Sequence, residues 1–135
     1  MENERNLYHD LDSILYSREE IAAAVRALGE RITADYRGKN PVFICILKGA
    51  SVFFSDLIRQ VDLPLEIEFM AVSSYGASTK SSGEVRLVKD LDRSILGRDV
   101  IIVEDIVDSG MSMSYLKDNL RTRGPASLKL LTLLD

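Results

Sequence analysis

The feature that most constrains the fold is a run of four β-branched residues, Val-Ile-Ile-Val, at positions 100–103. No polar residue alternates with them, which is typical of a strand buried on both faces of a parallel sheet. A strand of this kind needs helices on each side of its sheet. The run therefore predicts an α/β fold.

Acidic and small residues follow this run at once. Glu104 and Asp105 stand where the predicted strand ends, at the edge where open α/β sheets bind their ligands. Next, Asp-Ser-Gly-Met-Ser at 108–112 opens a helical pattern, and the N–H groups at a helix start favour a phosphate. Carboxylates bind sugar hydroxyls and Mg²⁺, so the stretch suggests a site for a phosphorylated sugar. Taken singly, Asp108 or Ser109 is equally well explained as a helix N-cap.

The remaining patterns predict a mostly parallel central sheet of about five strands flanked by helices on both faces, in one domain. Apolar runs predict the other four strands at 42–47, 65–72, 84–89 and 127–134. The capping-box pattern Ser-Arg-Glu-Glu begins a predicted helix at residue 17 that ends near residue 36. Two more helices are expected after Gly49 and after Gly110.

Composition narrows the functional classes. The chain has 135 residues and a net charge of −4 with no basic block, which does not favour a nucleic-acid surface. No apolar run is long enough to span a membrane, and the N-terminus lacks the features of a secretory signal, so a cytoplasmic protein is expected. The single cysteine, Cys45, excludes an internal disulfide, and the single histidine, His9, argues against a His-ligated zinc site.

The string Val-Glu-Asp-Ile-Val-Asp-Ser-Gly-Met-Ser at 103–112 resembles the phosphoribosyl pyrophosphate (PRPP) binding motif of type I phosphoribosyltransferases, most closely that of the hypoxanthine-guanine branch. The resemblance implies the type I fold and a glycosyltransferase of purine salvage. Such an enzyme transfers phosphoribosyl from PRPP to hypoxanthine or guanine and yields IMP or GMP and pyrophosphate.

The resemblance also assigns roles to residues of this motif. It makes Asp108 the general base that accepts a proton from the purine ring nitrogen. Glu104 and Asp105 would hold the ribose hydroxyls and the Mg²⁺ cofactor. The 5′-phosphate would be bound by the turn that comprises Ser109, Gly110, Met111 and Ser112.

Two further turns match the family. Leu-Lys-Gly at 47–49 corresponds to the family's pyrophosphate-binding turn, which often contains a cis peptide, so Lys48 and Gly49 take that role. Without the resemblance they would be a solvated cation and a tight turn. Ser74 and Tyr75, in a polar stretch at 73–83, correspond to a lid that closes over PRPP and excludes water. Without the resemblance this stretch is a flexible loop between two strands.

Family members continue past the position of Asp135 into a hood, with a lysine and an aromatic residue that recognise the purine and an acid that holds a second magnesium. We therefore expect residues 1–135 to be a single core domain without that hood, which binds PRPP with weak or absent transfer. Family members are commonly dimers or tetramers, so a homo-oligomer is expected.

Two alternatives remain open. The first is a regulatory module that binds PRPP or a nucleotide without catalysis. The second is a doubly wound signalling domain that binds magnesium alone. Signalling domains of that class carry an acidic pair after the first strand, where this chain has Lys48 and Gly49.

Overall fold

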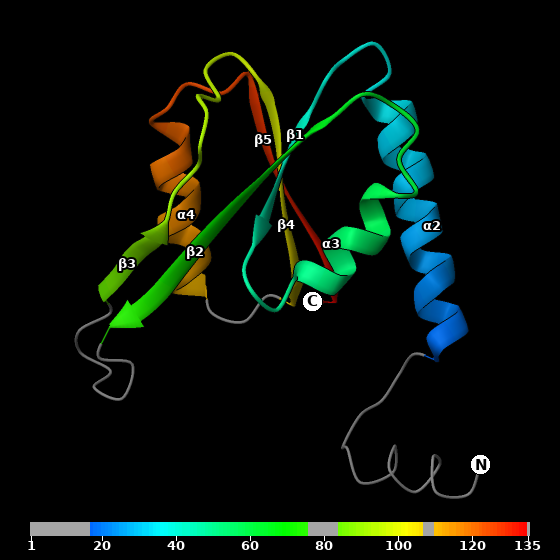
Figure 1. Ribbon diagram of the computed structural model, residues 1–135, viewed down its shortest axis with the longest axis horizontal. Coiled ribbons are helices and arrows are strands. Elements are labelled where there is room, and N and C mark those ends of the chain that lie inside the picture. The colour runs from blue at the N-terminus through cyan, green and yellow to red at the C-terminus, as the bar shows by residue number, and fades with distance from the viewer. Residues whose placement is uncertain (1–16, 76–83, 107–109, 135) are drawn as a thin grey trace, which may run out of the picture.

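The computed structural model describes residues 17–75, 84–106 and 110–134, which form a central sheet flanked by helices (Figure 1). The elements in chain order are α2 (Arg18–Asp35), β1 (Val42–Ile46), α3 (Ser51–Ile58), β2 (Glu66–Tyr75), β3 (Glu84–Lys89), β4 (Asp99–Ile106), α4 (Gly110–Arg121) and β5 (Ser127–Leu134). The predicted α/β class is confirmed, and so is the predicted five-stranded sheet.

The strands lie in the order β3-β2-β1-β4-β5. β1 pairs in parallel with β2 and β4, β4 pairs in parallel with β5, and β3 runs antiparallel to β2 at the edge. All five residues of β1 are buried, as a central parallel strand requires. Val42 lies opposite Val100 and Cys45 lies opposite Val103, so the end of β1 lies beside the middle of β4.

Helices cover both faces of the sheet. Figure 1 shows α2 and α3 on one side and α4 on the other. On the first side, the rings of Phe54 in α3 and Phe69 in β2 lie 5.6 Å apart between their centroids. On the second side, from residue 113 onward, α4 buries Met113, Leu116 and Leu120 at helical spacing. Among the described residues, no helix has the length and hydropathy needed to cross a bilayer.

Helix α2 begins at the predicted capping box. The Ser17 hydroxyl accepts a hydrogen bond from the Glu20 N–H at 3.1 Å, and the Glu20 carboxylate accepts one from the Ser17 N–H at 2.7 Å. Further along, Gly29 faces the end of α3, where a Cβ would lie 2.6 Å from the carbonyl oxygen of Gln60. Glycine at this position therefore lets the two helices approach closely.

An ion-pair clamp joins the starts of three strands at the amino edge of the sheet. The Glu66 carboxylate accepts hydrogen bonds from Arg98 and from Arg93, each at 2.8 Å. Arg98 also donates to the carbonyl oxygen of Asn40 at 2.8 Å. The hydrogen bond from Arg98 is the largest influence on the pKa of Glu66, and the pKa lies below its ordinary value.

This lowered pKa predicts a stability difference that depends on pH. Glu66 contributes stability above its unfolded pKa of about 4.3, and the contribution is lost as the pH falls through the lower folded pKa. Replacing Glu66 with glutamine should therefore reduce the free energy of unfolding at about pH 7, and the difference should become smaller at about pH 2, because the native carboxyl takes up its proton as the pH falls through the folded pKa. Urea denaturation of both proteins at the two pH values measures this. An equal difference at both values would contradict the prediction.

Candidate functional site

The strand order predicts a ligand crevice at the carboxyl ends of β1 and β4. From β1 the chain passes through α3 to β2 on one side, whereas from β4 it passes through α4 to β5 on the other side. The two crossover helices lie on opposite faces of the sheet (Figure 1). This reversal between β1 and β4 is a topological switch point, where open α/β sheets bind their ligands.

The turn after β1 forms one wall of this crevice. Lys48 and Gly49 are exposed, whereas Ala50 is fully buried where α3 begins. The N–H of Leu47 donates to the carbonyl oxygen of Met70 in β2 at 2.9 Å, which attaches the start of the turn to the sheet. The peptide bond between Leu47 and Lys48 is cis, as the resemblance led us to expect. The structure thus places both predicted pyrophosphate-binding residues at the switch point.

The other wall is formed by the end of β4 and the start of α4. Glu104 is half-buried and lies opposite Thr132 of β5. We expected the strand to end at Val103, but β4 continues to Ile106, so Glu104 and Asp105 are strand residues. The physical reason is the ladder with β5, which pairs as far as Ile106, whereas the ladder with β1 stops at Val103.

The predicted phosphate turn is described only in part. Helix α4 begins at Gly110, so Gly110, Met111 and Ser112 form its first turn. The fourth member of the predicted turn, Ser109, and the predicted general base, Asp108, lie outside the described residues. The helix start that would face a 5′-phosphate is therefore next to the carboxyl end of β4, as the sequence predicts.

The predicted lid residues lie on an extended arm. β2 pairs with β1 only as far as Met70 but continues to Tyr75. Ser74 and Tyr75 pair instead with β3, opposite Val85 and Glu84. We expected a loop to begin at residue 73, and the structure extends the strand past it because β3 supplies a second ladder. The rest of the predicted lid, residues 76–83, lies outside the described residues.

The carboxylates that follow Val103 suit a metal ion that is bound jointly by the protein and by its substrate. In the described part of the chain, no group of three or more His, Cys, Asp or Glu residues could hold a metal ion. Mg²⁺ characteristically uses one or two carboxylates together with water and substrate phosphates. Glu104 and Asp105 at the end of β4 match that requirement.

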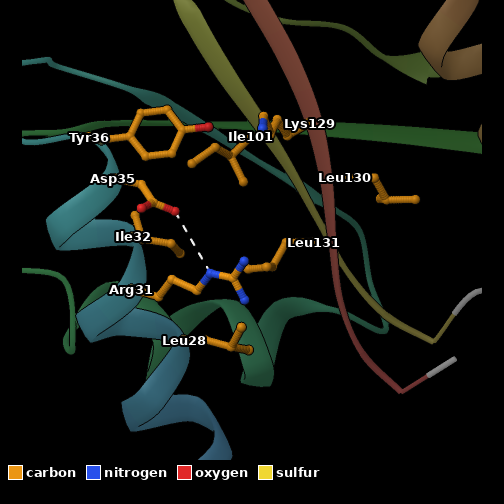
Figure 2. A pocket seen from close by; sticks show the side chains of 9 residues that line it. All are labelled: Leu28, Arg31, Ile32, Asp35, Tyr36, Ile101, Lys129, Leu130 and Leu131. Atoms are coloured by element: carbon orange, nitrogen blue, oxygen red, sulfur yellow. Dashed lines mark ion pairs between the residues drawn. The ribbon is translucent and has the colours of Figure 1, made fainter.

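A separate cavity of about 270 Å³ lies between α2 and the β4-β5 edge (Figure 2). Arg31 and Asp35 form an ion pair at its rim, with Arg31 Nε 3.8 Å from Asp35 Oδ2. Burial, together with the charges of Asp99 and Asp35, raises the pKa of the Tyr36 hydroxyl. The lining residues are Leu28, Arg31, Ile32, Asp35, Tyr36, Ile101, Lys129, Leu130 and Leu131. None of them belongs to the predicted site, and no sequence pattern points to this cavity.

The fold defines a doubly wound α/β protein, a class that binds its ligands at the topological switch point. Comparison with known proteins identifies the family, because residues 12–135 match the model of the phosphoribosyl transferase domain. The chain belongs to the phosphoribosyltransferase family.

Individual relatives confirm the predicted hypoxanthine-guanine branch. The hypoxanthine-guanine phosphoribosyltransferase of Bacillus subtilis is 51% identical over 127 residues, which cover 94% of this chain and 71% of that protein. The bifunctional protein TilS/HprT of Listeria innocua is 48% identical over 130 residues, which cover 96% of this chain but only 20% of that protein. A crystal structure of the hypoxanthine phosphoribosyltransferase of Staphylococcus aureus superposes with a TM-score of 0.84 at 42% identity, covering 93% of this chain and 68% of that one.

Proposed function

We propose that this chain is the PRPP-binding core of a purine-salvage enzyme that transfers phosphoribosyl from PRPP to hypoxanthine or guanine. The products would be IMP or GMP and pyrophosphate. The observation that carries the proposal is the pairing of β1 with β4 as far as Cys45 and Val103, because the Lys48 turn and the pair Glu104-Asp105 follow these two strand positions in the sequence. The relatives at about half identity, named hypoxanthine-guanine phosphoribosyltransferases, support the same reaction.

In this proposal the two walls of the crevice bind the groups on either side of the bond that breaks, which are the pyrophosphate and the ribose. Lys48 and the backbone N–H of Gly49 bind the departing pyrophosphate, whose negative charge increases as the bond to the sugar lengthens. Glu104 and Asp105 accept hydrogen bonds from the ribose hydroxyls and so orient the sugar. This arrangement stabilises a transition state in which the sugar carries positive charge and the leaving group carries negative charge.

Residues 108–112, which follow β4 and include the start of α4, would position the 5′-phosphate and the purine. Ser109, Gly110, Met111 and Ser112 bind the 5′-phosphate at the start of α4, where helix N–H groups point outward. Asp108 accepts the proton released from the purine ring nitrogen as the new bond forms. Ser74 and Tyr75, on the arm of β2, belong to the lid that excludes water from the sugar cation.

Magnesium would be held by Glu104 and Asp105, directly or through water, together with oxygens of PRPP. When bound, the ion neutralises charge on the pyrophosphate and helps to orient the sugar hydroxyls. The carboxylates contribute by fixing the position of the ribose relative to the Lys48 turn.

We also propose a cytoplasmic homo-oligomer, either a dimer or a tetramer. Four large apolar side chains are exposed in the described residues, namely Val52, Ile67, Val88 and Leu96. Apolar surface of this kind marks contact sites when it is contiguous. Sedimentation equilibrium distinguishes a monomer from these assemblies.

Titration calorimetry with Mg²⁺ and PRPP tests the proposed function. The expected result is saturable binding of PRPP that weakens when the metal is removed with EDTA, because the ion links the carboxylates to the substrate. Hypoxanthine or guanine is then added and nucleotide formation is followed by absorbance. Formation of IMP or GMP in this step would support the proposed transfer. Absence of PRPP binding would contradict the proposal.

A further inference from the structure

The turn that follows β1 is held firmly at both ends. At its start, the N–H of Leu47 donates to β2 through the carbonyl oxygen of Met70 at 2.9 Å. At its end, the buried Ala50 accepts a hydrogen bond from the N–H of Phe54 at 2.8 Å, which begins helix α3. Between these points Lys48 and Gly49 are exposed. The orientation of their peptide groups decides where the turn can donate hydrogen bonds.

Ser51 holds the peptide group in the middle of this turn. Its N–H donates to the carbonyl oxygen of Lys48 at 3.1 Å. Its hydroxyl donates to the same oxygen at 2.7 Å. One serine therefore directs the Lys48 carbonyl toward the start of α3 through two hydrogen bonds.

This contact sets the direction of the Gly49 N–H. The peptide bond between Lys48 and Gly49 is not among the cis bonds of the chain, and a trans peptide is planar, so its N–H points opposite to its carbonyl. Because Ser51 draws the Lys48 carbonyl toward α3, the Gly49 N–H points away from the helix start. A hydrogen bond accepted by the carbonyl also polarises the peptide group and strengthens its N–H as a donor.

We propose that Ser51 is a positioning residue for the pyrophosphate group, acting through the Lys48–Gly49 peptide without touching the ligand. The inference rests on the proposed function, which assigns pyrophosphate to this turn. It goes further because it names a hydroxyl, outside the family motif, that aims the Gly49 N–H. Ligands with a pyrophosphate group therefore depend on Ser51, and ligands bound only by the phosphate turn of α4 do not.

Replacing Ser51 with alanine removes the hydroxyl and leaves the backbone hydrogen bond in place. Loss of one such hydrogen bond predicts about a threefold to tenfold rise in the Kd of PRPP and of inorganic pyrophosphate, each measured with Mg²⁺ by calorimetry. The Kd of ribose 5-phosphate, which lacks the pyrophosphate group, should be unchanged. Ser51→Thr keeps a hydroxyl and should restore the native affinity for PRPP.

Ser55→Ala is the matched control, because Ser55 is an exposed serine one turn further along α3. It should alter none of the three affinities. Equal weakening of pyrophosphate and ribose 5-phosphate by Ser51→Ala would overturn the inference, since it would indicate general damage to the fold. Unchanged PRPP affinity in Ser51→Ala would overturn it too, while the proposed function would stand. Failure of the native chain to bind PRPP would overturn both.

Discussion

Replacing Asp108 with asparagine is expected to lower kcat by about 10²–10⁴-fold, because the amide cannot accept the proton released from the purine. Asparagine also serves as a helix N-cap, so the start of α4 should be preserved and the Kd of PRPP should change by less than about threefold. We would measure turnover in a protein in which residues 1–135 are continued by the C-terminal part of the Bacillus subtilis relative.

The control for this prediction is Asp118→Asn, which makes the same change of charge on an exposed residue of α4. It should leave kcat near its native value. If Asp108→Asn retained native turnover, Asp108 would not be the general base. If it lost PRPP affinity together with turnover, its role would be to shape the phosphate turn.

Replacing Leu116 with alanine is expected to reduce the free energy of unfolding by about 2–5 kcal/mol. Leu116 is 1% exposed and packs with Ile102 and Val100 of β4 in the core between α4 and the sheet. Alanine would leave a cavity there, because the central strands are fixed by their ladders on both sides and cannot move into it. Urea denaturation followed by circular dichroism measures the loss.

Ser114→Ala provides the comparison for this second substitution, since Ser114 is an exposed residue of the same helix. Its effect should stay within about 0.5 kcal/mol. A loss of less than about 1 kcal/mol for Leu116→Ala would show that the core around α4 relaxes to fill the space.

The fold was predictable because its signals are local. Four β-branched residues in β4, the apolar run of β1 and the capping box at Ser17 each specify their element within a few positions. The ends of the strands were not predictable in the same way. β4 extends through Glu104 and Asp105 because β5 pairs with it, and β2 extends to Tyr75 because β3 pairs with it. Hydrogen bonds from a partner strand override the local preference of such residues.

The candidate site was predictable as two separate turns, and their proximity follows from the strand order. The amino-edge clamp was not predictable, because Glu66 meets Arg93 and Arg98 across 27 and 32 positions of sequence. The cavity between α2 and β5 was missed for a similar reason, since Arg31 and Lys129 come to line the same cavity only through the tertiary fold. Side chains that acquire their partners in this way carry no local pattern.

The distance between the paired strands β1 and β4 separates the two halves of the proposed site. Hydrogen-bonded neighbouring strands are separated by about 4.8 Å, a spacing that is common to all sheets and resists deformation. In the proposed site one strand end binds the leaving group and the next binds the sugar, so the PRPP molecule spans this interval and the bond that breaks lies within it. Changes in the loops would then alter how tightly each half of PRPP is held. Changes in the buried run from Val42 to Cys45 would leave this spacing in place, because the backbone hydrogen bonds between β1 and β4 set it.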